Sequence, residues 1–122
     1  MTSTRSLVVK CTCGDEAPER CSQAFTVAST ALAAGVDVSL WLTGPAVWMA
    51  VPGRAEAFTL EQSAPLPGLR DAVLAAGALT VCTQCAARRE LAQDDLLPGV
   101  RIAGSTSFVE EILADGVQAI VY

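Results

Sequence analysis

The sequence predicts an α/β fold of three layers, in which helices cover both faces of a five-stranded, mainly parallel sheet. The chain has 122 residues, a length typical of one domain. Hydrophobic residues make up 52% and charged residues 17%, so the chain can bury a core. Short apolar segments alternate with segments of helical periodicity, which is the pattern of βαβ units. We therefore expect residues 1–122 to form a single domain.

Residues 5–12 predict the first buried strand because they are few, apolar and rich in β-branched side chains. Asp15 is then expected to cap a helix that runs to residue 34, with acidic residues and a proline in its first turn. Gly35 stands where a glycine commonly ends a helix. The apolar positions of this helix recur at helical spacing: Cys21, Phe25, Ala28 and Leu32.

Residues 36–42 predict the second strand, and the long segment 43–67 follows it. Proline and glycine interrupt this segment, which leaves room for a short helical turn at 46–51. So long an irregular segment in a small domain is typically functional or part of an oligomer surface. We expect it to expose apolar area through four residues: Trp48, Met49, Val51 and Phe58.

The second half of the chain repeats the alternation of strands and helices. Glycines are expected to end two of its helices, at Gly77 and Gly116. Ser107 and Glu110 have the spacing of a capping box that would open the last helix, through residue 114. The expected helices are 68–76, 83–91 and 107–114, and the expected strands are 78–82, 100–103 and 118–121.

The charge pattern excludes several function classes. The net charge is -5 and Lys and Arg do not cluster, so we expect no direct binding of nucleic acid, which depends on neutralising phosphates. No apolar run approaches the length that spans a bilayer, so we expect no membrane association. The opening stretch is too short for a signal peptide, which favours a cytoplasmic protein. Phosphate-binding glycine motifs are absent from the sequence.

Histidine is absent, which excludes Ser-His-Asp triads, Cys-His dyads and histidine-containing metal sites. Five cysteines are present instead. An odd number of cysteines in a cytoplasmic chain argues against a framework of disulfides. Thiol chemistry, metal binding and burial as small apolar residues are the uses that remain.

Cys82 and Cys85 form a C-x-x-C unit where the third predicted strand passes into a helix. The thiolate is the reactive form of cysteine, and free backbone N–H groups at the start of a helix stabilise it. We predict that Cys82 is the nucleophile and that Cys85 can form a disulfide with it. Arg88 follows on the same helix, and its charge is suited to an anionic sulfur group.

Cys11 and Cys13 end the first predicted strand, at the same edge of the sheet as Cys82. We therefore expect four thiols to rim one crevice, with Cys11, Cys13 and Arg88 contacting the substrate. A tetrathiolate metal site is the alternative. Our leading interpretation needs neither a metal nor an organic cofactor, and it assigns Cys21 to the core. A redox sensor and a passive structural subunit remain further alternatives.

The chain resembles the DsrE/DsrF-like family of small sulfur-relay proteins over nearly its whole length. The segment 81–89, VCTQCAARR, is the most specific part of the likeness. Further matching segments are the opening strand, 33–36, 38–44, 74–77, 95–96, 99–100 and 102–104. The chain departs from the family pattern at Glu90, where a glycine is common, and at 11–14, where the first strand usually ends in Thr/Ser-Gly.

This resemblance implies a function as well as a fold. In the sulfur-carrying members, a cysteine at the position of Cys82 accepts persulfide sulfur and passes it on, and other members carry a C-x-x-C there. The implied partners are sulfur donor and acceptor proteins. The resemblance also implies a homotrimer or homohexamer in the cytoplasm.

Overall fold

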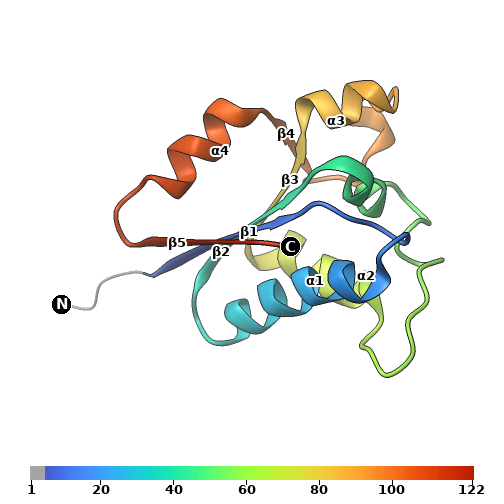
Figure 1. Cartoon of the computed structure of the whole chain (residues 1–122), viewed down its shortest axis with the longest axis horizontal. Helices are drawn as coiled ribbons and strands as arrows, with labels where there is room; N and C mark the ends of the chain where they lie inside the picture. Colours follow the sequence, from blue (N-terminus) through green and yellow to red (C-terminus); the bar gives the residue numbers. More distant parts are fainter. Residues whose placement is uncertain (1–4) are drawn as a thin grey trace.

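The computed structural model describes residues 5–122, which form a five-stranded sheet with every strand parallel (Figure 1). This confirms the predicted α/β class. The strand order is β4–β3–β2–β1–β5, so β2 lies between β1 and β3. Residues 1–4 lie outside the described residues. They begin the opening stretch that we predict to be too short for a signal peptide. The strands are β1 (Ser6–Cys11), β2 (Asp37–Leu42), β3 (Ala78–Cys82), β4 (Arg101–Ala103) and β5 (Val117–Val121).

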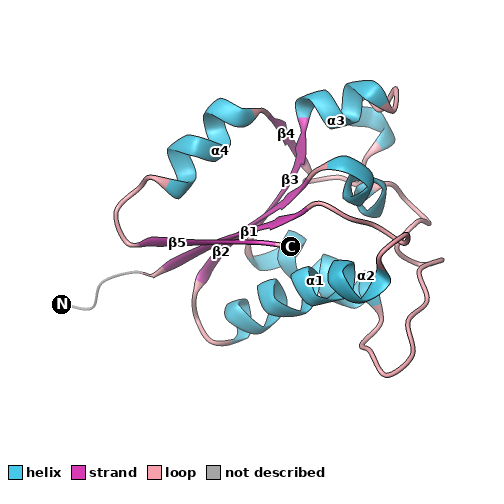
Figure 2. Ribbon diagram, viewed as in Figure 1, coloured by secondary structure: helices cyan, strands magenta, loops and turns pink. Residues whose placement is uncertain are grey.

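Helices cover the two faces of the sheet unequally, as Figure 2 shows. The helices α1 (Pro18–Ala33) and α2 (Leu66–Ala76) pack on one face. On the other face lies α4 (Ser105–Ile112), while α3 (Thr83–Arg88) begins directly at the end of β3. Two 3-10 helices complete the fold: η1 (Gly44–Ala50) and η2 (Gln93–Asp95).

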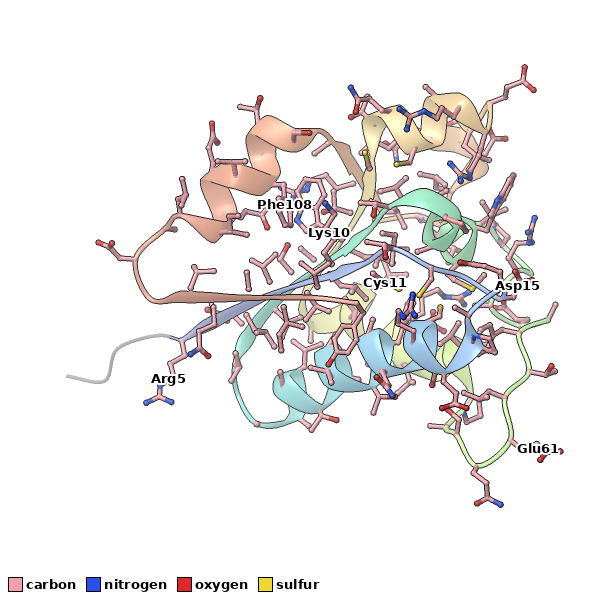
Figure 3. The ribbon with its side chains drawn as sticks, in the orientation of Figure 1. Arg5, Lys10, Cys11, Asp15, Glu61 and Phe108 are labelled. Atoms are coloured by element: carbon pink, nitrogen blue, oxygen red, sulfur yellow. The ribbon has the colours of Figure 1, made fainter. Side chains whose placement is uncertain are left out.

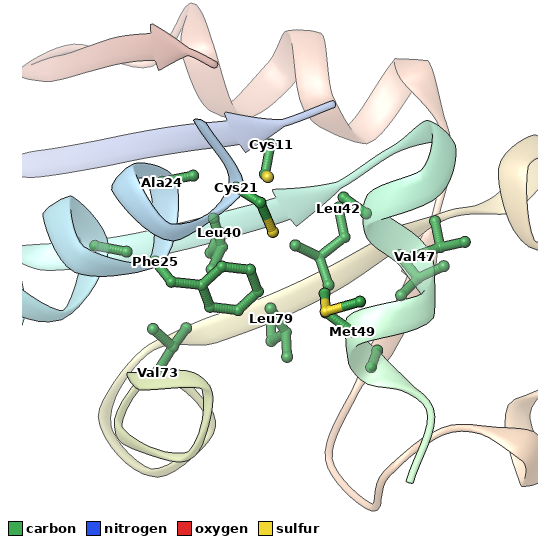
Figure 4. Packing of buried hydrophobic residues seen from close by; sticks show 14 of the residues in the cluster. Cys11, Cys21, Ala24, Phe25, Leu40, Leu42, Val47, Met49, Val73 and Leu79 are labelled. Carbon is green, nitrogen blue, oxygen red and sulfur yellow. The ribbon is translucent and has the colours of Figure 1, made fainter. Parts of the chain in front are cut away.

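The main core lies between the sheet and the pair α1 and α2 (Figure 4). Side chains alternate along each strand, and one set from β1, β2 and β3 faces this layer. Phe25 of α1 is completely buried among them. Each fully buried side chain of this size contributes on the order of 1.5–3 kcal/mol to folding. The strand residues of this set are Val9, Cys11, Leu40, Leu42, Leu79 and Val81.

Polar and aromatic contacts, rather than a dense core, hold α4 against the opposite face. Glu111 of α4 accepts hydrogen bonds from the Ser39 hydroxyl at 2.6 Å and from Trp41 Nε1 at 3.1 Å. Arg101 of β4 also pairs with this carboxylate. Burial alone would raise the pKa of Glu111, but these three partners lower it below its ordinary value. Phe108 packs edge-to-face against Trp41, with ring centroids 5.3 Å apart.

Three predicted helix starts were wrong. Helix α1 begins at Pro18 after Ala17, whereas Asp15 is exposed and lies before the helix. Proline suits the first helical position because that position needs no backbone donor, and this fixes the start. Helix α4 begins at Ser105, with only Gly104 between it and the end of β4, so Ser107 lies inside the helix and forms no capping box with Glu110. Helix α2 starts at residue 66 and α3 stops at 88, rather than at 68 and 91.

The segment 43–67 does not expose the expected apolar surface. Met49 is buried, and Trp48, Val51 and Phe58 pack partly buried against the core. The buried Arg70 of α2 donates two hydrogen bonds to the Glu56 carboxylate, at 3.1 and 2.8 Å, which ties the segment to the helix. The exposed large apolar side chains lie instead on α4 and β5: Val109, Leu113, Ile120 and Val121.

Glu90 adopts a left-handed backbone conformation, with φ of 56°. A residue with a Cβ atom is strained there by about 1–2 kcal/mol, and glycine is not. We expect Glu90→Gly to raise the free energy of unfolding by about 1 kcal/mol, because relief of this strain exceeds the entropy that glycine loses on folding. Urea denaturation measures the change. Glu90→Ala is the matched control and should give no gain; an equal gain in both variants would contradict the explanation.

Candidate functional site

Cys82 is the last residue of β3 and directly precedes α3. Its backbone is still extended, with φ of -62° and ψ of 129°, so the strand passes into the helix without a loop. Cys82 is half-buried. Because side chains alternate along β3, it shares a face of the sheet with Thr80, which accepts a hydrogen bond from Arg101. The thiol therefore lies at the carboxyl edge of the sheet, on the side that α4 covers.

The surroundings of Cys82 favour its thiolate. Burial alone would raise the pKa of Cys82, yet four other influences outweigh burial and lower it. They are, in order of size, the backbone N–H of Cys85, the Cys85 thiol, the backbone N–H of Gln84 and the charge of Lys10. The first three are polar groups in the first turn of α3 that favour the charged sulfur, although the Cys82 side chain forms no capping hydrogen bond with the helix. The site thus has the electrostatics of a nucleophilic cysteine.

Cys85 is buried in the first turn of α3, and both its thiol and its backbone N–H lower the pKa of Cys82. Its sulfur accepts a hydrogen bond from the backbone N–H of Gly44, at 3.2 Å. Gly44 has φ of 54°, and a Cβ atom there would lie 3.2 Å from the carbonyl oxygen of Thr12. The site therefore requires a glycine at this position, for both its conformation and its close packing.

Arg88 contacts Cys85 rather than Cys82, with its Nη1 atom 4.0 Å from the Cys85 sulfur. It is exposed, and it ends the short helix that contains Cys85 and that Cys82 directly precedes. The neighbouring Arg89 donates a hydrogen bond to the Cys85 carbonyl at 3.1 Å, which fixes the helix turn. Positive charge thus lies at the Cys85 side of the pair.

The expectation that four thiols rim one crevice is wrong. Cys11 and Cys13 are buried, and Cys11 faces α1, where Cys21 belongs to the same buried core cluster. The sheet separates them from Cys82, since alternation along the strands turns Cys11 and Cys82 to opposite faces. Strand order adds to the separation because β2 lies between the two strands. Cys11 and Cys13 therefore do not contact a substrate held at Cys82.

The structure also gives no support to the tetrathiolate alternative. Within residues 5–122, no group of three or more Cys, Asp or Glu side chains is placed to hold a metal ion. The C-x-x-C unit alone offers two sulfurs, whereas a structural tetrahedral site needs four ligands.

Sequence reasoning missed Lys10 as part of the site. It precedes Cys11, and alternation places it on the face that Cys82 shares, where its charge lowers the pKa of that thiol. Figure 3 shows Lys10 beside Phe108, and its Nζ atom lies 4.8 Å from the ring centroid. Alternation along the first strand already places Lys10 on the opposite face from Cys11. Only the strand order and the direction of the Cys82 side chain show that Lys10 and Cys82 share that face.

Fold and site together define a small α/β domain with a dithiol at a strand-to-helix junction. The model of the DsrE/DsrF-like family matches residues 6–122, and the chain belongs to that family. A search of curated proteins found no match.

Two solved structures share the fold. The ychN protein from E. coli has 15% sequence identity and a TM-score of 0.81; the match covers 98% of this chain and 100% of that one. MTH1491 from Methanobacterium thermoautotrophicum, a protein of unknown function, has 12% identity and a TM-score of 0.67 over the same shares. At these identities the likeness shows the fold alone. Among the described residues, no helix combines the length and apolar character that crossing a membrane requires.

Lys10 provides a direct test of the site's electrostatics. We expect Lys10→Met to shift the alkylation of Cys82 to higher pH, because the variant removes a charge that lowers the thiol's pKa. The rate of iodoacetamide labelling against pH, followed by mass spectrometry on peptide 71–88, measures the shift. Lys10→Arg is the matched control and should keep the original profile. Identical profiles for Lys10→Met and the unmodified protein would show that Lys10 does not act on Cys82.

Proposed function

We propose that the protein is a persulfide carrier in which Cys82 accepts and transfers sulfane sulfur. One observation carries the proposal: a half-buried thiol at a strand end directly precedes a helix, and the first backbone N–H groups of that helix lower the pKa of the thiol. These donors favour the thiolate, and the partial exposure leaves room for a reacting group. Membership of the DsrE/DsrF-like family supports this chemistry.

The first step loads the carrier. The Cys82 thiolate attacks the outer sulfur of a donor persulfide, R–S–SH. A bond forms between that sulfur and Cys82, the donor's S–S bond breaks, and the donor leaves as a thiolate while Cys82 becomes Cys–S–SH. An acceptor thiolate then attacks the outer sulfur and releases Cys82 as a thiolate. No net oxidation occurs in either transfer, so the carrier returns to its starting state.

Cys85 supplies a second route of release. Its thiolate can attack the Cys82 sulfur, which forms the Cys82–Cys85 disulfide and expels hydrosulfide. Two electrons from a dithiol reductant are then needed to restore the two thiols. The exposed Arg88, close to Cys85, is suited to hold the anionic outer sulfur before it leaves. We assign the carrier to the cytoplasm, where reductants of this class are abundant, with donor and acceptor proteins as partners.

Labelling with a sulfane-sulfur donor tests this function. Incubation with a glutathione persulfide donor should add one sulfur to Cys82, detected by mass spectrometry of peptide 71–88 after alkylation. Cys85→Ser should retain that added sulfur for longer, because it lacks the attacking thiol, whereas Cys82→Ser should gain none on this peptide. Absence of a one-sulfur gain at Cys82 in the unmodified protein would refute the proposal.

We propose further that the protein is a homotrimer or homohexamer that buries α4 and β5. Every residue of α4 keeps part of its surface exposed, and Leu113, just past its end, is 75% exposed. β5 is an edge strand of the sheet, and Val121 on it is 65% exposed. Exposed apolar side chains beside an open strand edge are typical of an interface.

A charge placed on this surface should separate the subunits. We expect light scattering to give three or six times 12.6 kDa for the unmodified protein and 12.6 kDa for Leu113→Glu, since a buried unpaired carboxylate opposes association. Thr26→Glu introduces the same charge at an exposed position of α1, on the other face of the sheet, and should leave the assembly intact. A particle of 12.6 kDa for the unmodified protein would disprove the assembly.

A further inference from the structure

A row of side chains crosses the sheet beneath α4, and Lys10 belongs to it. Lys10 of β1 is the register partner of Trp41 in β2, and both side chains contact α4. Trp41 in turn partners Thr80 of β3, and Thr80 partners Arg101 of β4. Residues two positions further along a strand face the same way, so Cys82 lies in the next row, nearer the carboxyl edge of the sheet.

The two sides of Cys82 within its own row differ. On the β4 side, the chain turns through Gly104 directly into α4. On the other side, the register continues past the ends of β2 and β1 to Thr43 and Thr12. Thr43 keeps an extended backbone, with φ of -129° and ψ of 163°; its side chain is half-buried, and that of Thr12 is exposed. A molecule that reacts at Cys82 can therefore extend toward β1, the strand that carries Lys10.

The positive charge of Lys10 is not neutralised by a carboxylate. The other cation of its row, Arg101, pairs with Glu111. Lys10 instead places its Nζ atom 4.8 Å from the centroid of the Phe108 ring, which holds the ammonium group without cancelling its charge (Figure 3). None of the ion pairs among residues 5–122 includes Lys10. Its side chain is half-buried, so water and salt screen its attraction for an anion less than at a fully exposed lysine.

We propose that Lys10 binds the free carboxylate of a low-molecular-weight persulfide, so that Cys82 accepts sulfur from such a donor as well as from a protein partner. This inference rests on the function proposed above and names the chemistry of one donor. The backbones of β1 and β3 are about 10 Å apart, and the long Lys10 side chain spans part of that distance. The remaining gap suits a cysteine derivative, in which a few bonds join the sulfur to the carboxylate. A cysteine inside a protein chain has no free carboxylate of its own.

The carboxylate stays bound while the sulfur is transferred. The Cys82 thiolate attacks the outer sulfur of the donor, R–S–SH. A bond forms between that sulfur and Cys82, the donor's S–S bond breaks, and the donor leaves as a thiolate. The outer sulfur keeps its proton, so Cys82 becomes Cys–S–SH and no oxidant or reductant is needed. Lys10 offsets the repulsion that an anionic donor meets from the Cys82 thiolate and from a chain of net charge -5.

Two donors that differ in this one charge test the site. N-acetylcysteine persulfide has the carboxylate, whereas N-acetylcysteine amide persulfide has a neutral amide there, as a cysteine in a protein chain has. The ratio of their rates of sulfur transfer to Cys82 is divided by the same ratio for the isolated peptide 71–88, which corrects for the donors' own reactivity. We expect the folded protein to favour the acid about threefold, as a partly exposed ion pair would, and Lys10→Met to show no preference.

The ratio separates binding from the thiol's pKa, because a change in the pKa of Cys82 alters both rates alike. Lys10→Arg keeps the charge and should keep the preference. Arg5→Met removes one positive charge from an exposed residue just before β1, at the strand end far from Cys82, and should also keep it. An equal preference in Lys10→Met and the unmodified protein, or none in the unmodified protein, would overturn the inference.

A second pair of reagents tests the carboxylate site without sulfur transfer. Iodoacetate and iodoacetamide differ by the same exchange of carboxylate for amide, and both alkylate thiols. Their rate ratio at Cys82, relative to the peptide, should be raised in the unmodified protein and fall to the peptide's value in Lys10→Met; a ratio that Lys10→Met leaves unchanged would refute the carboxylate site. If neither persulfide loads Cys82 while this ratio depends on Lys10, the sulfur carrier is refuted and the carboxylate site stands. If Cys82 gains sulfur at rates that ignore the carboxylate, the carrier stands and this inference fails.

Discussion

The position of the Cys82 sulfur at the start of α3, beside the first backbone N–H groups of that helix, is the constraint on which the site depends. It arises because β3 passes into α3 at Cys82 without a loop, so the N–H groups of Gln84 and Cys85 lower the pKa of the strand's last side chain. A helix start has such donors to spare because its first N–H groups have no partner within the helix. The placement of Cys82 as the last strand residue thus lowers the pKa of a half-buried thiol that burial alone would keep protonated, as the proposed role of nucleophile requires.

The two faces of the sheet support this site in different ways. The face under α1 and α2 is a close-packed core that fixes the strands and contains the thiols of Cys11, Cys13 and Cys21. The opposite face is thinner: α4 rests on it through Glu111 and Phe108, and a cavity of about 250 Å³ remains between α4 and the sheet. The charge of Lys10 acts on Cys82 from this second face. Rigidity therefore comes from one side of the sheet, and the charge that acts on Cys82 comes from the other.

The sequence was sufficient for the order of elements, since short apolar strands and amphipathic helices have distinct periods. It also indicated the C-x-x-C unit at the end of the third strand. Local capping signals misled at Asp15 and Ser107, because strand ends and Pro18 determined where the helices begin. The grouping of Cys11 with Cys82 failed for a different reason: strand order and side-chain direction decide which face a residue occupies, and they are set by packing between distant segments. Lys10 was missed for the same reason.

Titration of the Cys82 thiol tests the central claim most directly. The rate of iodoacetamide alkylation at Cys82 is measured against pH in the folded protein and in the isolated peptide 71–88, which has the same sequence without the fold. The donors in the fold predict a pKa for Cys82 in the protein below that in the peptide, which should lie near the usual value of about 8.5. A pKa in the folded protein equal to or above the peptide's would contradict the account.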